Sequence, residues 1–157
     1  MQRHTYIVTF LIVFFLTSVV FSQANADEIE DMTETLNQKI LEHDWKGFGA
    51  TFTEFIKKDG RYSSSDAEKA GDSASKTVTS LDTFGEILSH TQIRMDRCGD
   101  RIARTVTVFF SKDGQFYIAY WFFKAENNWS TNTITYEGYG STSTFVKLLT
   151  GALSFDC

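Results

Sequence analysis

Among the side chains of this sequence that could do chemistry, Arg104 has the most informative position. It lies in a run of β-branched and aromatic residues, which is typical of a buried strand. A guanidinium held inside a fold can bind a ligand carboxylate through two parallel hydrogen bonds. An internal Asp or Glu can neutralise it equally well. Arg104 therefore indicates either an anion-binding pocket or a buried ion pair.

The histidines favour structural roles over catalysis. His43 and Asp44 precede Trp45, but adjacent residues on a helix point about 100° apart and cannot both face one substrate. We interpret them as part of a solvated surface. His90 is expected at the end of a short helix, where an imidazolium interacts favourably with the last carbonyl groups.

No other pattern in the sequence predicts a catalytic or metal site. A run of alternating charge precedes Arg104 and is interpreted as a solvated salt-bridge cluster in a connector; it comprises Asp96, Arg97, Asp100 and Arg101. The two cysteines and three histidines lack the spacing of metal ligands. The sequence contains neither a glycine-rich phosphate loop nor a nucleophile elbow. We expect no cofactor and assign no catalytic residue.

Arg104 belongs to a predicted meander of three antiparallel strands between Ile102 and Glu137. The strands read IARTVTVFF, QFYIAYWFF and WSTNTITYE, and they are separated by the turns Lys112-Asp113-Gly114 and Glu126-Asn127-Asn128. Asp-Gly between two such runs is a strong hairpin signal, because Gly tolerates the positive φ that a tight turn needs.

Pairing residues across these turns sorts their side chains into two faces. We expect Phe110 opposite Tyr117, and Phe123 opposite Ser130. The first face is the better core, but it has a polar corner, and buried polar groups need partners. That corner and the aromatic residues beside it are the pocket candidates: Arg104, Trp121, Phe123, Ser130, Asn132 and Tyr117.

The second face has an aromatic and aliphatic centre strand flanked by threonines. Such a surface is too apolar for free exposure and too polar for a sealed core, which favours a sheet-to-sheet contact in a homodimer. The interface candidates are Phe109, Ile118, Tyr120, Phe122 and Thr133. A bulge of odd length would invert both faces beyond it.

The segments before the meander predict helices. Apolar residues recur at helical spacing from Asp27 to Leu41, and we expect a break near Gly47 to Gly49 before a second apolar stripe. Residues 57–76 carry almost no apolar residue and are expected to form a surface loop or a poorly packed helical piece. A short helix ending near His90 and a polar connector over residues 91–100 should follow, the connector with room for a short strand at residues 92–95.

The termini and the bulk charge bound the location of the protein. Residues 1–26 combine a weakly positive start, an apolar run and a small-residue ending, which predicts a cleaved signal peptide, with an uncleaved N-terminal anchor as the alternative. The mature chain, residues 27–157, fits one domain and is expected to be periplasmic or secreted, with no membrane association. Its formal charge moves from −5 to −6 with the loss of Arg3, and it has no basic cluster, so nucleic acid is not an expected partner.

Two predictions concern the end of the chain. In an oxidising compartment Cys98 and Cys157 are expected to form a disulfide, although free or intermolecular thiols are the alternatives. The apolar residues between Ser141 and Phe155 suffice for a terminal helix that packs back on the body, and a fourth strand is the alternative.

The order of elements resembles the nuclear transport factor 2-like superfamily, and in particular its small exported bacterial members. The resemblance covers mainly the part from Cys98 to Tyr139, and it consists of Gly99-Asp100, an arginine at Arg101 or Arg104, the aromatic strand Phe116–Lys124, and Trp129. It implies a curved sheet that wraps a helix to form a cone. Members of that superfamily include both isomerase-like or dehydratase-like enzymes and non-catalytic binding modules, so the fold does not choose between them.

The sequence therefore predicts an α+β domain with N-terminal helices on a curved antiparallel sheet of at least three long strands. The leading hypothesis for its function is a homodimeric, non-catalytic module that binds a small molecule or a protein. The alternative is a small isomerase-like or hydrolase-like enzyme with a pocket formed by Trp121, Arg104 and Asn132.

Overall fold

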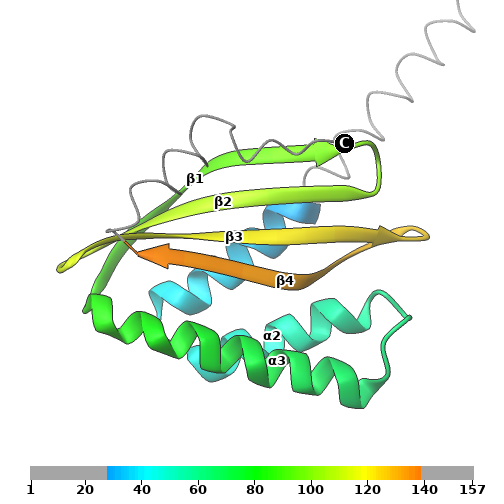
Figure 1. The fold of residues 1–157 in the computed structure, drawn as a ribbon, viewed down its shortest axis with the longest axis horizontal. Coiled ribbons are helices and arrows are strands. Elements are labelled where there is room, and N and C mark those ends of the chain that lie inside the picture. Colours follow the sequence, from blue (N-terminus) through cyan, green and yellow to red (C-terminus); the bar gives the residue numbers. More distant parts are fainter. Residues whose placement is uncertain (1–27, 139–157) are drawn as a thin grey trace, which may run out of the picture. The chain divides into compact units, whose positions relative to one another are not determined.

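The structure is a computed structural model that describes residues 28–138 (Figure 1). The expected signal peptide, the terminal helix and Cys157 lie outside these residues. A first helix covers residues 28–41. It is followed by α2 (Trp45–Lys57), α3 (Ser64–Thr79), the 3₁₀ helix η1 (Ser80–Phe84), β1 (Ile87–Cys98), β2 (Ile102–Ser111), β3 (Gly114–Ala125) and β4 (Asn128–Gly138). This arrangement confirms the predicted α+β class, with helices packed on an antiparallel sheet.

The four strands form one antiparallel meander in the order β1-β2-β3-β4 (Figure 1). The β2–β3 hairpin turns at Lys112 and Asp113, with Ser111 opposite Gly114, whose φ is +145°. Val108, not Phe110, is therefore opposite Tyr117. The expected register was wrong by two residues, but a shift of two keeps each side chain on its predicted face.

The β3–β4 pairing changes register at a bulge. Phe123 is opposite Ser130, as predicted, but Trp121 is opposite Thr133, which leaves Asn132 as the extra residue. Beyond this point the predicted faces are inverted, so that Ile134 is opposite Tyr120 instead of Ala119. One inserted residue reverses the faces because side chains alternate with a period of two.

β1 is a full edge strand, whereas its first residues were expected to end a short helix and the rest to be a polar connector with at most a short strand. Its pairing with β2 shifts twice, between Ile87 and Ser89 and between Gln92 and Arg94, so Leu88 and Ile93 are the extra residues. Two bulges in one strand destroy the period-two alternation that identifies a strand in a sequence.

The helix boundaries also differ from the prediction. The chain breaks at His43, which has a φ of +54°, and Asp44 caps α2 by accepting a hydrogen bond from the Gly47 amide at 2.8 Å. Gly47 and Gly49 therefore lie inside α2 and do not interrupt it. His43 takes a conformation that few non-glycine residues adopt, which marks a sharp turn between the two helices.

Most of the stretch predicted to be a surface loop or a poorly packed helical piece forms the regular helix α3. Its buried side comprises Ala67, Gly71, Ala74 and Val78, which recur at helical spacing. These residues are small because α2 approaches closely: a Cβ atom on Gly71 would come within 2.5 Å of the Gly49 carbonyl oxygen. A stripe of Ala and Gly does not register as apolar periodicity, which explains why the sequence does not distinguish the helix from a loop.

The first helix covers the second face of the sheet. Thr33 and Thr105 join their hydroxyl groups at 3.0 Å, and Asn37 donates its Nδ2 to the Thr107 hydroxyl at 3.1 Å. The Tyr120 hydroxyl in turn donates to Asn37 Oδ1 at 3.0 Å. These neutral groups are all buried, and they fix the helix against β2 and β3.

This cover corrects the expected dimer surface. Phe109, Ile118, Tyr120 and Phe122 are fully buried within the chain and form the core under the helices. Thr133 is exposed, but it lies beyond the β4 bulge and opposite Trp121. Four of the five interface candidates are therefore unavailable to a second copy of the folded chain.

Candidate functional site

Arg104 binds an internal carboxylate, which is one of the two roles predicted for it. Asp96 on β1 is its direct cross-strand neighbour, and Arg104 donates from Nε at 3.1 Å and from Nη2 at 2.6 Å to Asp96 Oδ2. Arg104 is 3% exposed, and its guanidinium lies 5.4 Å from the centre of the Trp121 ring. Arg94 donates to the other Asp96 oxygen at 2.6 Å. The corner is thus an ion-pair cluster rather than an open anion site.

The electrostatics keep Asp96 ionised. Burial alone would raise the pKa of this carboxyl group, but the hydrogen bonds from Arg104 and then Arg94 outweigh burial and lower it. A carboxylate that is held below its ordinary pKa by two guanidinium groups is a poor general base at neutral pH.

Ser130, the second polar candidate, forms its side-chain hydrogen bonds with residues other than Arg104. Its hydroxyl donates to Asp59 Oδ2 at 2.9 Å and contacts the Phe123 carbonyl oxygen at 3.2 Å. The Asp59 side chain is fully buried and also accepts two hydrogen bonds from Arg61, which itself is exposed. These bonds from Arg61 lower the pKa of the Asp59 carboxyl group. This second cluster joins the end of α2 to β4.

Asn132, the third polar candidate, lies at the β4 bulge. Its Nδ2 donates to the Tyr62 hydroxyl at 2.8 Å, and its Oδ1 accepts from Thr133 at 3.0 Å. The bulge is what directs this side chain away from Arg104, since Thr133 takes the place opposite Trp121.

The six pocket candidates therefore do not form one pocket. Arg104 and Trp121 are direct neighbours, as are Phe123 and Ser130. Tyr117 lies four residues from Trp121 along β3, about 13 Å away at the usual rise of a strand. It belongs instead to a buried apolar cluster of Val106, Val108, Tyr117 and Ala119.

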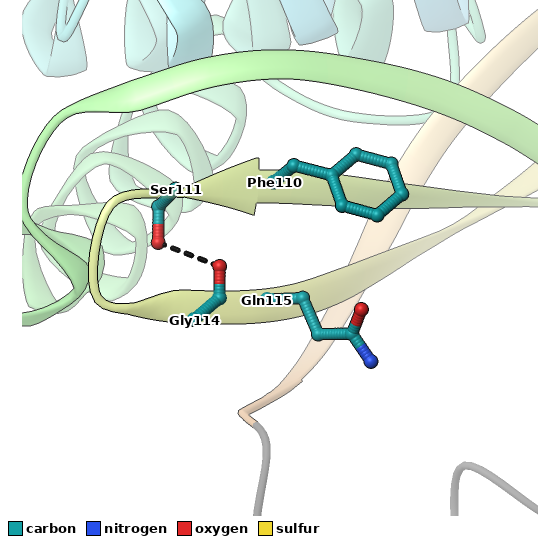
Figure 2. Close-up of a pocket in the computed structure, with 4 residues that line it drawn as sticks. All are labelled: Phe110, Ser111, Gly114 and Gln115. Atoms are coloured by element: carbon teal, nitrogen blue, oxygen red, sulfur yellow. Dashed lines mark hydrogen bonds between the residues drawn. The ribbon is translucent and has the colours of Figure 1, made fainter.

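Two hollows lie elsewhere on the part of the chain described. The first, of about 350 Å³, is at the β2–β3 hairpin, where Phe110 and Gln115 extend beside Ser111 and Gly114 (Figure 2). The second, of about 250 Å³, is bounded by α2, α3 and β4, and its lining includes Phe52, Ala74 and Asn132. Neither is lined by a titratable side chain among residues 28–138, so neither offers an acid or a base.

The histidines pair with carboxylates in two separate places. His43 Nδ1 is 3.2 Å from Asp82 Oδ1, which also accepts from Trp45 Nε1 at 3.0 Å. This surface pair involves Asp82, whereas Asp44, the expected neighbour, caps α2. Both the imidazole and the carboxylate are substantially exposed, and no serine, threonine or cysteine side chain is bonded to the imidazole among the residues described.

His90 was expected at a helix end and instead lies within β1. Its Nε2 is 3.0 Å from Glu34 Oε2, and its ring lies 5.4 Å from that of Phe109. The hydrogen bonds of Glu34 to Gln38 and then to His90 lower the pKa of the Glu34 carboxyl group. This pair ties the edge strand to the first helix, which is a structural role.

The sequence interpretation missed two carboxylates, Asp96 and Asp59. Asp96 was assigned to a solvated cluster because β1 was not recognised, and Asp59 was assigned to a surface loop. A buried arginine in a predicted strand requires a counter-charge, so the acidic residues of the preceding segment, Asp96 and Asp100, were the candidates for its partner.

Neither the remaining features of the described chain nor its comparison with known proteins identifies a further site. No group of three or more potential metal ligands occurs within residues 28–138. None of the helices in this part of the chain is long and apolar enough to cross a membrane. No protein-family model matches the chain, and no curated protein matches it.

Proposed function

We propose that this protein is an exported, non-catalytic interaction module that forms a homodimer. The observation that carries the proposal is the internal pairing of Arg104 with Asp96. The residue best suited to hold an anionic ligand is already neutralised inside the chain. Ser130 and Asn132 are likewise bonded to their own partners, so the polar corner keeps no group for a substrate.

The enzyme alternative lacks a suitable acid or base. Asp96 is the carboxyl group nearest to the predicted pocket, and its lowered pKa leaves it ionised and paired at neutral pH. A catalytic carboxyl group needs a pKa near the working pH. The same side chain that neutralises Arg104 is therefore unsuited to proton transfer.

The surface we propose for the dimer lies along the β1 edge. Exposed large apolar side chains in residues 28–138 comprise Tyr62 and three residues of the β1–β2 side, Leu88 (56% exposed), Ile93 (41%) and Phe110 (43%). Leu88 and Ile93 are the two bulge residues. Bulges disfavour pairing of one edge strand with another. We therefore propose that the two copies meet through these side chains, without extending the sheet.

The proposal also includes the export of the protein and its resemblance to a known superfamily. The predicted signal peptide supports export to the periplasm or to the outside of the cell, where a disulfide between Cys98 and Cys157 would persist. The resemblance to the nuclear transport factor 2-like superfamily supports a binding role, since that superfamily contains many non-catalytic modules.

Light scattering on the mature chain, residues 27–157, tests the dimer. We expect a dimer at about 50 μM, a concentration at which stable interfaces persist. Ile93→Lys should give a monomer, because it places a charge in the apolar contact, whereas Gln92→Lys, an exposed neighbour on the same strand, should leave a dimer. A monomeric parent, or a dimeric Ile93→Lys variant, would exclude this interface.

A further inference from the structure

The hollow of about 250 Å³ lies at the β4 edge of the sheet, beside α2 and α3 (Figure 1). The residues that α3 contributes to its lining recur at helical spacing and share one face of the helix: Ala70, Ser73, Ala74 and Thr77. On β4 three successive residues line the hollow, residues 132–134, although side chains normally alternate between the two faces of a strand. The bulge at Asn132 breaks this alternation and brings Asn132 and Thr133 to the same hollow.

The base of the hollow is apolar, and its size suits one small ring. Phe52 and Ala74 in the lining are buried, and Ile134 is half-buried. Pockets for drug-sized ligands span roughly 300–1,000 Å³, so a hollow of about 250 Å³ fits a smaller molecule. No charged side chain among residues 28–138 lines it. A charged ligand would lose hydration there without gaining a counter-charge, so we expect a neutral ligand.

Two hydroxyl groups of the lining are oriented as hydrogen-bond acceptors. Thr77 donates its hydroxyl proton to the Ser73 carbonyl oxygen at 2.9 Å, and Thr133 donates its own to Asn132 Oδ1 at 3.0 Å. A hydroxyl group has one proton and two lone pairs, so both threonine oxygens can still accept a hydrogen bond. The donors that complete them must come from a bound molecule or from water.

A hydrogen-bond donor lies next to this lining. The Tyr62 hydroxyl accepts from Asn132 Nδ2 at 2.8 Å, which leaves its own proton for another acceptor. Tyr62 is 39% exposed, so a ligand can reach it from solvent. A ligand that fits must therefore accept from Tyr62 and donate to the threonines. Hydroxyl groups do both, and a small ring that carries several of them also covers the apolar base.

We propose that this hollow binds the ring of a neutral monosaccharide, either as the free sugar or at the end of a glycan. The C–H groups of the ring pack on the apolar base, and its hydroxyl groups donate to Thr77 and Thr133. The Tyr62 hydroxyl donates to a further ring oxygen. Asn132 is a positioning residue, since its amide holds both the Tyr62 and the Thr133 hydroxyl. The site is on the opposite edge of the sheet from β1, so it does not depend on the proposed dimer.

An NMR titration of the nitrogen-labelled mature chain, residues 27–157, with glucose, galactose and mannose tests the site. With at least one of these sugars we expect the amides of residues 73–77 and 132–134 to shift with a Kd of about 1 mM, as for a small ligand with few polar contacts. The uronic acid of the same sugar should bind at least about tenfold more weakly, because its carboxylate finds no counter-charge. Shifts that stay absent up to about 50 mM of every sugar, or that fall only on other residues, would overturn the proposal.

Two substitutions at exposed positions test the lining. Thr133→Val removes one acceptor and keeps the shape of the side chain, so it should weaken binding about tenfold. Thr135→Val, an exposed threonine of the same strand outside the hollow, is the matched control and should keep the parent affinity. Ser73→Trp fills the hollow from α3 and should abolish the shifts. Parent affinity in Thr133→Val or in a folded Ser73→Trp variant would overturn the proposal.

A trisaccharide of the bound sugar distinguishes the two sources of the ring. It should bind at least as tightly as the single ring if the hollow takes the end of a glycan, and more weakly if it takes the free sugar. Both results support the site only where the shifts fall on the same amides as with the monosaccharide. A trisaccharide that shifts a different set of amides, with the same Kd in the parent and in Ser73→Trp, would overturn the assignment of a glycan end to this hollow.

Discussion

Both faces of the sheet carry buried polar groups, but these groups are connected in different directions. On the helix-covered face, Asn37 reaches from the first helix to Thr107 and Tyr120 on two strands. On the opposite face, Asp96 and Arg104 join two neighbouring strands of the same sheet. The first set of bonds links two layers of the fold, and the second lies within one layer.

The two sets of bonds therefore differ in whether they fix the placement of a helix on the sheet. Hydrogen bonds between layers select one placement of the helix, because any other placement leaves buried polar groups without partners. The bond between Asp96 and Arg104 connects two strands of one sheet and does not by itself select the placement of another layer.

The largest expected effect is that of Asn37→Ala on the helix-covered face. It removes the acceptor of the Tyr120 hydroxyl and the donor to Thr107, and both of these groups are fully buried. Two unsatisfied groups should lower the free energy of unfolding by roughly 3 kcal/mol. Urea denaturation measures this loss. Gln38→Ala, at the exposed next position, is the control and should change stability by less than about 0.5 kcal/mol.

A double substitution separates unsatisfied groups from lost packing. Adding Tyr120→Phe to Asn37→Ala removes one of the two unsatisfied hydroxyl groups and should recover part of the lost stability. The effect of Tyr120→Phe is measured in the parent and in Asn37→Ala. If Tyr120→Phe lowers the stability equally in both, the two side chains are not coupled, and the network has no role in positioning the helix.

A smaller effect is expected on the opposite face, and it should be asymmetric. Asp96→Ala removes the carboxylate that binds the buried Arg104 guanidinium and should cost about 2 kcal/mol, below the usual value for a buried pair because the Asp96 side chain is 14% exposed. Arg104→Met should cost less, because Arg94 still neutralises Asp96. Thermal unfolding of both variants gives the order, and equal losses would contradict the asymmetry.

The fold was predictable where its signals are local. The aromatic and β-branched runs and the Asp-Gly turn are contiguous in sequence, so β2, β3 and β4 were recognised. β1 was missed because the bulges at Leu88 and Ile93 interrupt its alternation. The sequence does not distinguish α3 from a surface loop, because its buried stripe is built from alanine and glycine. In each case tertiary packing, and not local propensity, determines the element.

The candidate site was less predictable than the fold, because its members come together through pairing. Arg104 was identified from its own strand, but its partner lies on β1 at a distance set by the β1–β2 register. Asn132 was assigned to the corner, and a single bulge removes it. Register and bulges are properties of two strands at once, so one strand's sequence does not determine them.

The smallest expected effect is a difference in acid sensitivity between the two faces. The pKa of Asp96 is lowered in the folded protein, so its pairing stabilises the fold above the unfolded-state pKa, and this contribution is lost as the pH falls through the folded-state value. Asn37, Thr107 and Tyr120 carry no charge in that range. We therefore expect Asp96→Asn to be destabilised less than the parent between about pH 5 and pH 3, whereas Asn37→Ala should keep the parent's pH profile at lower stability. Urea denaturation across this range measures both profiles.

Other carboxylates, including Asp59, contribute equally to all three proteins, so the difference isolates Asp96. A parent and an Asp96→Asn variant with parallel profiles would mean that the ion pair contributes nothing to stability, and the contrast between the two faces would be one of geometry alone.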